Sequence, residues 1–137
     1  MKYIKVSSWF LGVSIFMFGI LKFFDPFKSW YQVQINNSGL GNLSYAMGIM
    51  GEIVVGFTII SALIFREKLS EVVYKSLLKV AFGMIAFMMI VAVYVHIHIN
   101  VPAEVLPLKI KAPIIPIFFM AIALTNLGLF STKNKTS

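Results

Sequence analysis

Three ionisable residues stand among otherwise apolar residues in this sequence: Lys22, Glu52 and His96. A carboxylate or an imidazole can exchange protons with a bound substrate when it lies within hydrogen-bond reach of the reacting group. The ammonium of a lysine can pair with a carboxylate and keep it charged. The chemistry that these residue types allow is therefore proton exchange or a buried ion pair. Which one applies depends on the elements that position them.

The composition indicates that those elements lie in lipid. The chain is 59% hydrophobic and 12% charged, with a mean hydropathy of +0.89, whereas soluble domains carry about 25% charged residues. About 20 apolar residues cross a hydrocarbon core of about 30 Å. Stretches of this kind cover residues 6–24, 43–65, 77–95 and 113–130. They predict an all-α fold, an integral membrane four-helix bundle that forms a single domain over residues 1–137.

The first apolar stretch also follows two lysines, as a signal peptide would. The run is too long for the apolar region of a signal peptide, and "MFGILKFFDP" has no small-residue cleavage site. We therefore expect a retained helix that ends where Pro26 stops it. Trp30 and Tyr31 follow and suit the lipid–water interface. The polar segment "QVQINNSGLGN" then reads as a turn-rich connector, and "STKNKTS" as a short polar tail.

The basic residues predict the orientation of the bundle. The net charge is +7, and a four-helix topology places the N-terminus, the second connector and the C-terminus on one side. That side carries Lys2, Lys5, Arg66, Lys68, Lys75, Lys79, Lys133 and Lys135, and the other carries Lys22, Lys28, Lys109 and Lys111. The positive-inside rule then places both termini in the cytoplasm. These charges can attract anionic lipid headgroups, and we expect no nucleic-acid partner. The chain has no cysteine, which excludes disulfides and electron transfer through thiol pairs.

Small residues mark the faces on which two of the helices meet. Ser44, Gly48, Glu52 and Gly56 recur at i, i+4 spacing, and Ser8, Gly12, Gly19 and Lys22 share a face of the first helix. Membrane helices associate through such small-residue stripes. The same topology places Lys22, Glu52 and His96 in the outer half of the bundle, with Glu52 about 13 Å below the outer surface. The alternatives are a functional polar centre and a buried ion pair that sets the helix register.

The segment "YVHIHINVPAEVLPLKIKAPIIP" gathers the remaining candidates. In an extended chain His96 and His98 would share a side and could bind a metal with Glu104, whereas on a helix they face opposite ways. We expect no metal and no haem, with His96 hydrogen-bonded inside the bundle. The prolines stiffen the segment. Between them Leu106, Leu108 and Ile110 alternate with Lys109 and Lys111, which suits an extended segment on the interface with its lysines toward headgroups. It is either a rigid lid or a plain connector.

With these residues described, the chain resembles the DoxX-like family of small four-helix integral membrane proteins. The motifs that carry the resemblance are "FGILKFFDP" with Lys22, Asp25 and Pro26, "GIMGEIVVG" with Glu52, and "MIAFMMIVAVYVH" ending at His96. The family is similar to subunits beside sulfur-oxidising quinone reductases, and includes members of oxidative-stress complexes and an animal branch that chaperones receptor assembly. The resemblance implies a polar centre of Lys22, Glu52 and His96 without assigned chemistry, and a bacterial plasma membrane.

Two functions remain open at this point. The first is a non-catalytic subunit or assembly factor, not an enzyme on its own, which binds a membrane protein partner or a second copy of itself. The second is a quinone-binding component of a membrane oxidoreductase, in which Glu52 or His96 exchanges protons; a small proton-coupled carrier is a weaker third. A packed Lys22–Glu52 pair favours the first function, and a ligand-sized void beside Glu52 and His96 favours the second.

Overall fold

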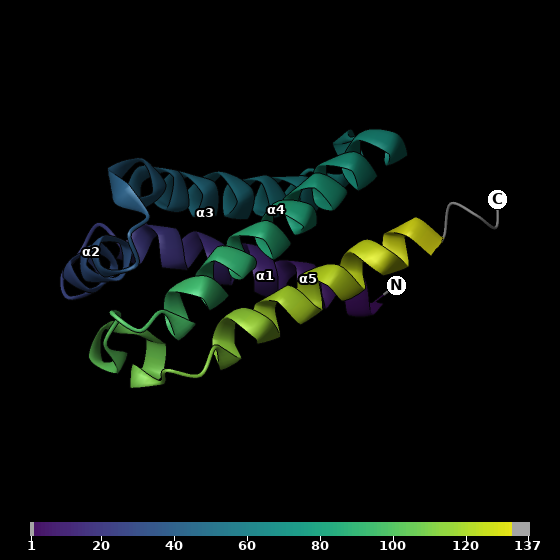
Figure 1. Cartoon of the computed structure of the whole chain (residues 1–137). Coiled ribbons are helices and arrows are strands. Elements are labelled where there is room, and N and C mark those ends of the chain that lie inside the picture. Colours follow the sequence, from purple (N-terminus) through teal and green to yellow (C-terminus); the bar gives the residue numbers. More distant parts are fainter. Residues whose placement is uncertain (1, 133–137) are drawn as a thin grey trace.

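The computed structural model describes residues 2–132, so the predicted polar tail with Lys133 and Lys135 lies outside the described residues. The described chain is helical and contains no strand, which confirms the all-α prediction. The helices are α1 (Lys2–Leu21), α2 (Phe27–Asn37), α3 (Gly41–Ile64), α4 (Glu71–Ile97) and α5 (Ile114–Thr132) (Figure 1). Short 3-10 turns at Arg66–Lys68, Ala103–Val105 and Pro107–Lys109 lie in the connectors.

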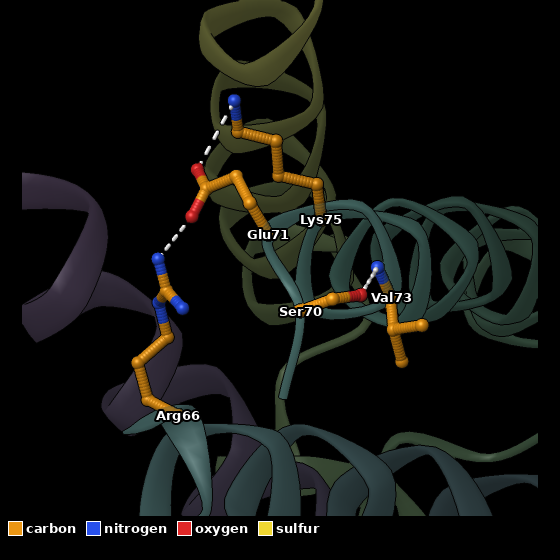
Figure 2. Close-up of polar contacts among 5 residues, drawn as sticks. All are labelled: Arg66, Ser70, Glu71, Val73 and Lys75. Atoms are coloured by element: carbon orange, nitrogen blue, oxygen red, sulfur yellow. Dashed lines mark hydrogen bonds and ion pairs between the residues drawn. The ribbon is translucent and has the colours of Figure 1, made fainter. Parts of the chain in front are cut away.

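Four of the helices, α1, α3, α4 and α5, are long and apolar enough to cross a membrane. The same four stretches were expected from hydropathy, with ends that differ by a few residues. The largest difference is at the start of α4, which begins at Glu71 instead of residue 77. The Ser70 side chain accepts a hydrogen bond from the Val73 amide and caps this helix, as Figure 2 shows. Lys75 therefore lies within α4, ahead of the predicted start of that helix.

The closest helix packing joins α1 to α3 through the two predicted glycine stripes. A Cβ built on Gly12 would lie 2.8 Å from the Ile59 side chain, and one built on Gly56 would lie 2.6 Å from the Phe16 backbone nitrogen. Any side chain at either glycine would force the helices apart. The small-residue seam predicted between these helices is thereby confirmed, and it sets how near the polar groups of the two helices can come.

The apolar core runs along the bundle between these helices. Its fully buried side chains include Leu11 of α1, Ile59 of α3 and Phe82 of α4. Phe82 stacks on Phe130 of α5 with 6.1 Å between ring centroids. α5 thus closes the bundle against α4 and, at fewer points, against α1.

The first half of the segment that we expected to be a turn-rich connector, residues 32–37, belongs instead to the short helix α2, and the turn is limited to residues 38–40. Tyr31 and Ile35, one turn apart, are buried against Ile49 of α3. Tyr31 is only 8% exposed, so its ring packs inside the bundle. The physical reason is the i, i+4 spacing of these two residues, which gives the helix one apolar face.

The two ends of the bundle differ in construction. In Figure 1, α1 begins and α5 ends at the end where α3 is joined to α4. At the opposite end α2 and the segment 98–113 lie across the bundle (Figure 1). We call α2 together with residues 98–113 the cap. Lys22, which follows the last residue of α1, lies at the end that the cap occupies.

Candidate functional site

Lys22 and Glu52 form an ion pair at the capped end of the bundle. The Lys22 ammonium nitrogen lies 2.5 Å from Oε2 of Glu52 and donates a hydrogen bond to it. The two side chains are 18% and 11% exposed, respectively. The contact joins the end of α1 to the middle of α3. Two of the three residues predicted to form a polar centre are therefore in contact.

Gly19 explains how the lysine reaches the carboxylate. A Cβ built on Gly19 would lie 3.1 Å from the Glu52 Cβ and 2.8 Å from the Ile53 side chain. The α1 backbone can approach α3 this closely because residue 19 has no side chain. Lys22 is three residues further on and so on the same face of the helix. The glycine and the lysine thus act together to place the ammonium beside Glu52.

Tyr31 of α2 covers the ion pair, and it is a site residue that the sequence analysis did not identify. The Lys22 ammonium lies 4.4 Å from the centroid of the Tyr31 ring, a cation–π distance. The phenol lies against Gly48 of α3 and donates to the Ser44 carbonyl at 3.5 Å. Burial raises the pKa of the Tyr31 phenol, and the charge of Glu52 raises that pKa further. The sequence feature that could have pointed to Tyr31 is Gly48, because its missing side chain leaves the space that the Tyr31 ring fills.

His96 is buried but is bonded to its own helix. It is 4% exposed, and its Nδ1 lies 2.8 Å from the Ala92 carbonyl oxygen. A carbonyl only accepts, so Nδ1 carries a proton in this contact. Among the hydrogen bonds and ion pairs of residues 2–132, His96 is joined to neither Lys22 nor Glu52. The histidine was expected to be hydrogen-bonded inside the bundle, and it is.

The other predicted side chains do not converge. His98 follows the last residue of α4, and its Nδ1 accepts a hydrogen bond from the Asn100 amide at 3.2 Å. Glu104 is exposed, and Asp25 is exposed and accepts from the Ser29 hydroxyl at 2.5 Å. Within residues 2–132 no three His, Cys, Asp or Glu side chains lie together as a metal site would require.

The segment between α4 and α5 is not the extended strip that its alternating pattern predicted. Two 3-10 turns interrupt it, and Leu108 and Lys109 each have a φ of 56°. Leu106 is 1% exposed whereas Leu108 is 77% exposed. The two leucines therefore do not share a side, because a turn breaks the two-residue period of an extended chain. Lys109 is exposed as expected.

Lys111 points into the segment and not toward headgroups, which corrects a second prediction. Its ammonium donates to the His98 carbonyl at 2.5 Å and to the Val101 carbonyl. Both carbonyls lie just beyond the end of α4, and the His98 carbonyl also accepts a hydrogen bond from the Val101 amide at 3.2 Å. A charged donor there ties the residues before α5 back to the end of α4. Lys111 is a structural residue of the cap.

Side-chain bonds also join the two halves of the cap. Gln34 of α2 donates to the Val105 carbonyl, and Asn37 donates to the Asn100 carbonyl at 3.0 Å. Beneath these bonds Val101 and Leu106 are buried. The segment 98–113 is therefore a packed cover bonded to α2, rather than a connector free of the bundle.

Two hollows among the described residues lie away from the ion pair. One of 260 Å³ lies between α3 and the start of α4. Another of 170 Å³ is lined by the first turns of α4. Neither is lined by Lys22, Glu52 or His96. The pair is thus packed among side chains.

A second polar contact lies on the α1–α5 side of the bundle and was also missed. The Ser7 hydroxyl donates to Oδ1 of Asn126 at 2.9 Å, and Asn126 is completely buried. Its Nδ2 and the hydroxyl oxygen of the buried Ser8 have no hydrogen-bond partner among the described residues. The signal in the sequence was a single asparagine within the last apolar stretch. Interhelical bonds of this kind contribute about 0.6 kcal/mol in membrane proteins.

The residues that carry the DoxX-like resemblance occupy distinct places in this geometry. Lys22 and Glu52 form the pair, His96 is buried in α4, and Asp25 is exposed beyond α1. No protein-family model, no curated protein and no solved structure matches the chain.

Proposed function

We propose that this chain is an integral membrane protein, with α1, α3, α4 and α5 crossing the bilayer, that serves as a non-catalytic subunit or assembly factor of a membrane complex. The observation that carries the proposal is the Lys22–Glu52 pair. It is nearly buried beneath Tyr31, and the two hollows described above do not reach it. A site that turns over a substrate needs space at its ionisable groups.

The surface of the bundle supports the membrane location. Large apolar side chains are exposed on the spanning helices, among them Phe57 (62%), Val80 (67%) and Phe87 (63%). Soluble monomers seldom expose contiguous apolar surface of this kind. In a bilayer the same side chains would contact lipid acyl chains and would not be exposed to water.

The proposed orientation places both termini in the cytoplasm. Lys2, Lys5 and the basic residues of the α3–α4 connector lie at the end opposite the cap, which makes that end the inner one by the positive-inside rule. The cap then lies outside, in a bacterial plasma membrane as the DoxX-like resemblance implies. Because the chain has no cysteine, single-cysteine variants can test this without background. In intact cells a membrane-impermeant maleimide should label Asn36→Cys and should label Glu67→Cys only after permeabilisation; the reverse result would invert the orientation.

The role we propose for the ion pair is to set the register of α1 against α3. A buried pair contributes little net stability, because desolvation offsets the attraction, but it disfavours arrangements that leave either charge alone. Gly19 and Gly48 support this role, since both make room for the groups that enclose the pair. The rigid end that results is a suitable surface for a partner protein or a second copy of the chain.

Mass spectrometry of the protein purified unheated in mild detergent tests the function. We expect a stoichiometric protein partner or a defined oligomer, and the same partner should remain with His98→Ala. A retained quinone that is lost in Glu52→Gln would overturn the proposal in favour of a quinone-binding component. A monomer that retains neither a protein nor a small molecule would also contradict it.

A further inference from the structure

The hollow between α3 and α4 lies at the end of the bundle opposite the ion pair. Its lining is almost wholly apolar and comes from three segments: the last turns of α3, the connector and the start of α4. The lining residues are Phe57, Thr58, Ser61, Ala62, Phe65, Leu69 and Leu77. From residue 57 to residue 65 the hollow follows α3 for about 12 Å. Its volume of 260 Å³ is below that of most drug-sized ligand pockets, and its length suits one chain of a lipid.

A cation lies beside one of the residues that line this hollow. The Lys68 ammonium is 5.6 Å from the ring centroid of Phe65, which is itself a lining residue. Lys68 takes part in none of the ion pairs between residues 2 and 132, so its charge is available. Lys68 belongs to the connector just past the end of α3.

The neighbouring cations are already engaged. Figure 2 shows Arg66 and Lys75 on either side of Glu71, each bonded to its carboxylate. The Arg66 guanidinium also lies 4.3 Å from the centroid of the Tyr74 ring. Between residues 66 and 79 there are four basic and two acidic side chains, so the connector keeps a positive charge after these pairs have formed. Lys68, beside the exposed Glu67, is thus the cation next to the hollow that takes part in no ion pair among the described residues.

We propose that this hollow binds an anionic phospholipid, with one acyl chain along Phe57, Ser61 and Phe65 and the phosphate at Lys68. The proposal rests on the membrane location proposed above. An apolar hollow that opens beside an unpaired cation complements a molecule with an apolar chain next to a negative phosphate. A zwitterionic lipid fits the hollow equally well but has no net charge for Lys68 to attract. The site should therefore prefer an anionic lipid over a zwitterionic lipid with the same acyl chains.

Native mass spectrometry of the full chain in mild detergent tests this, with phosphatidylglycerol and phosphatidylcholine of the same acyl chains as the probes. We expect the wild type to hold phosphatidylglycerol about fivefold more than phosphatidylcholine, which is the effect of one basic residue near the headgroup. Lys68→Ala should abolish this preference. The matched control is Lys79→Ala, since Lys79 is two residues from Leu77 and thus on the opposite side of α4. It should keep the preference.

A second pair of variants tests where the acyl chain lies. Ser61→Phe fills the hollow and should reduce retention of both lipids, whereas Ser76→Phe, in the other hollow, should not. Equal retention of the two lipids by the wild type, or an unchanged preference in Lys68→Ala, would overturn the inference. Because Lys68→Ala alters only an exposed side chain, it tests the inference even if Ser61→Phe does not fold. A membrane-extracted protein that shows no lipid preference contradicts this inference alone. A protein that is soluble without detergent contradicts the proposed membrane function itself.

Discussion

The backbone of α3 at Gly56 lies directly against the backbone of α1 at Phe16, where a Cβ on the glycine would come within 2.7 Å of the Phe16 Cα. Real Cβ contacts are not this short, so a substitution must move one of the helices. The displacement would reach Glu52, one turn along the same face of α3. Backbone contact between α1 and α3 is thus a condition for the ion pair.

Gly56→Ala is expected to destabilise the protein by about 1–3 kcal/mol, the usual effect of overpacking. Gly83→Ala is the matched control: Gly83 also lies inside a helix, but nothing lies within 4 Å of its added Cβ. It should leave stability unchanged or raise it by up to about 1 kcal/mol, because alanine favours the helix. Unfolding in a detergent mixture measures both variants. Equal stabilities would contradict the close packing of α1 on α3.

Glu52→Gln is expected to lower the yield of folded protein in detergent and to destabilise it by about 3 kcal/mol, because Lys22 would be left partly buried without its counter-charge. His98→Ala is the control, since the side chain of His98 bonds only to the nearby Asn100 amide. Gel filtration of unheated samples measures the yield. Adding Lys22→Met to Glu52→Gln should recover much of the loss. If Glu52→Gln and His98→Ala give equal yields, the pair does not hold the register.

Lys111→Met is expected to loosen the cap without unfolding the bundle. The variant removes charged donors from the His98 and Val101 carbonyls, and hydrogen bonds to a charged group contribute about 1.5–3 kcal/mol each. Hydrogen exchange of the amides in residues 98–106 should become faster, while exchange in α1 stays the same. Lys109→Met serves as the control, because Lys109 is exposed. Similar exchange in both variants would show that Lys111 does not tie the segment to α4.

The Tyr31 phenol is expected to remain protonated in folded protein at about pH 11, where an unburied tyrosine with a pKa of about 10 is mostly ionised. Because the pKa of Tyr31 is raised, its phenol loses the proton only at a higher pH than a free tyrosine does. The tyrosinate absorbance of folded wild type and folded Tyr31→Phe should therefore be the same at that pH. In denaturant the wild type should show the absorbance of one additional tyrosinate. A difference of one tyrosinate between the folded proteins would show that Tyr31 is open to water.

The four long helices could be predicted from sequence because the thickness of a hydrocarbon core sets how many apolar residues a crossing needs. The seam between α1 and α3 could be predicted too, since glycines at i, i+4 spacing mark one face whatever that face contacts. The nearness of Lys22 to Glu52 follows from the helix topology and the glycine seam together. Lys22 follows the last residue of α1, and Glu52 lies on the glycine stripe of α3 toward the same end of the bundle.

Other features depended on contacts between segments far apart in the chain, and only the tertiary structure decided them. The polar, turn-rich segment 32–42 predicted a connector, yet its first six residues lie in α2. Tyr31 becomes a core residue only where Gly48 leaves room for it. The alternating pattern of residues 106–111 predicted a strip on the interface. Instead Lys111 bonds to the His98 and Val101 carbonyls just beyond α4. Hydropathy and periodicity describe how one segment meets its solvent, whereas the space at Gly48 and the position of these carbonyls depend on how distant segments pack together.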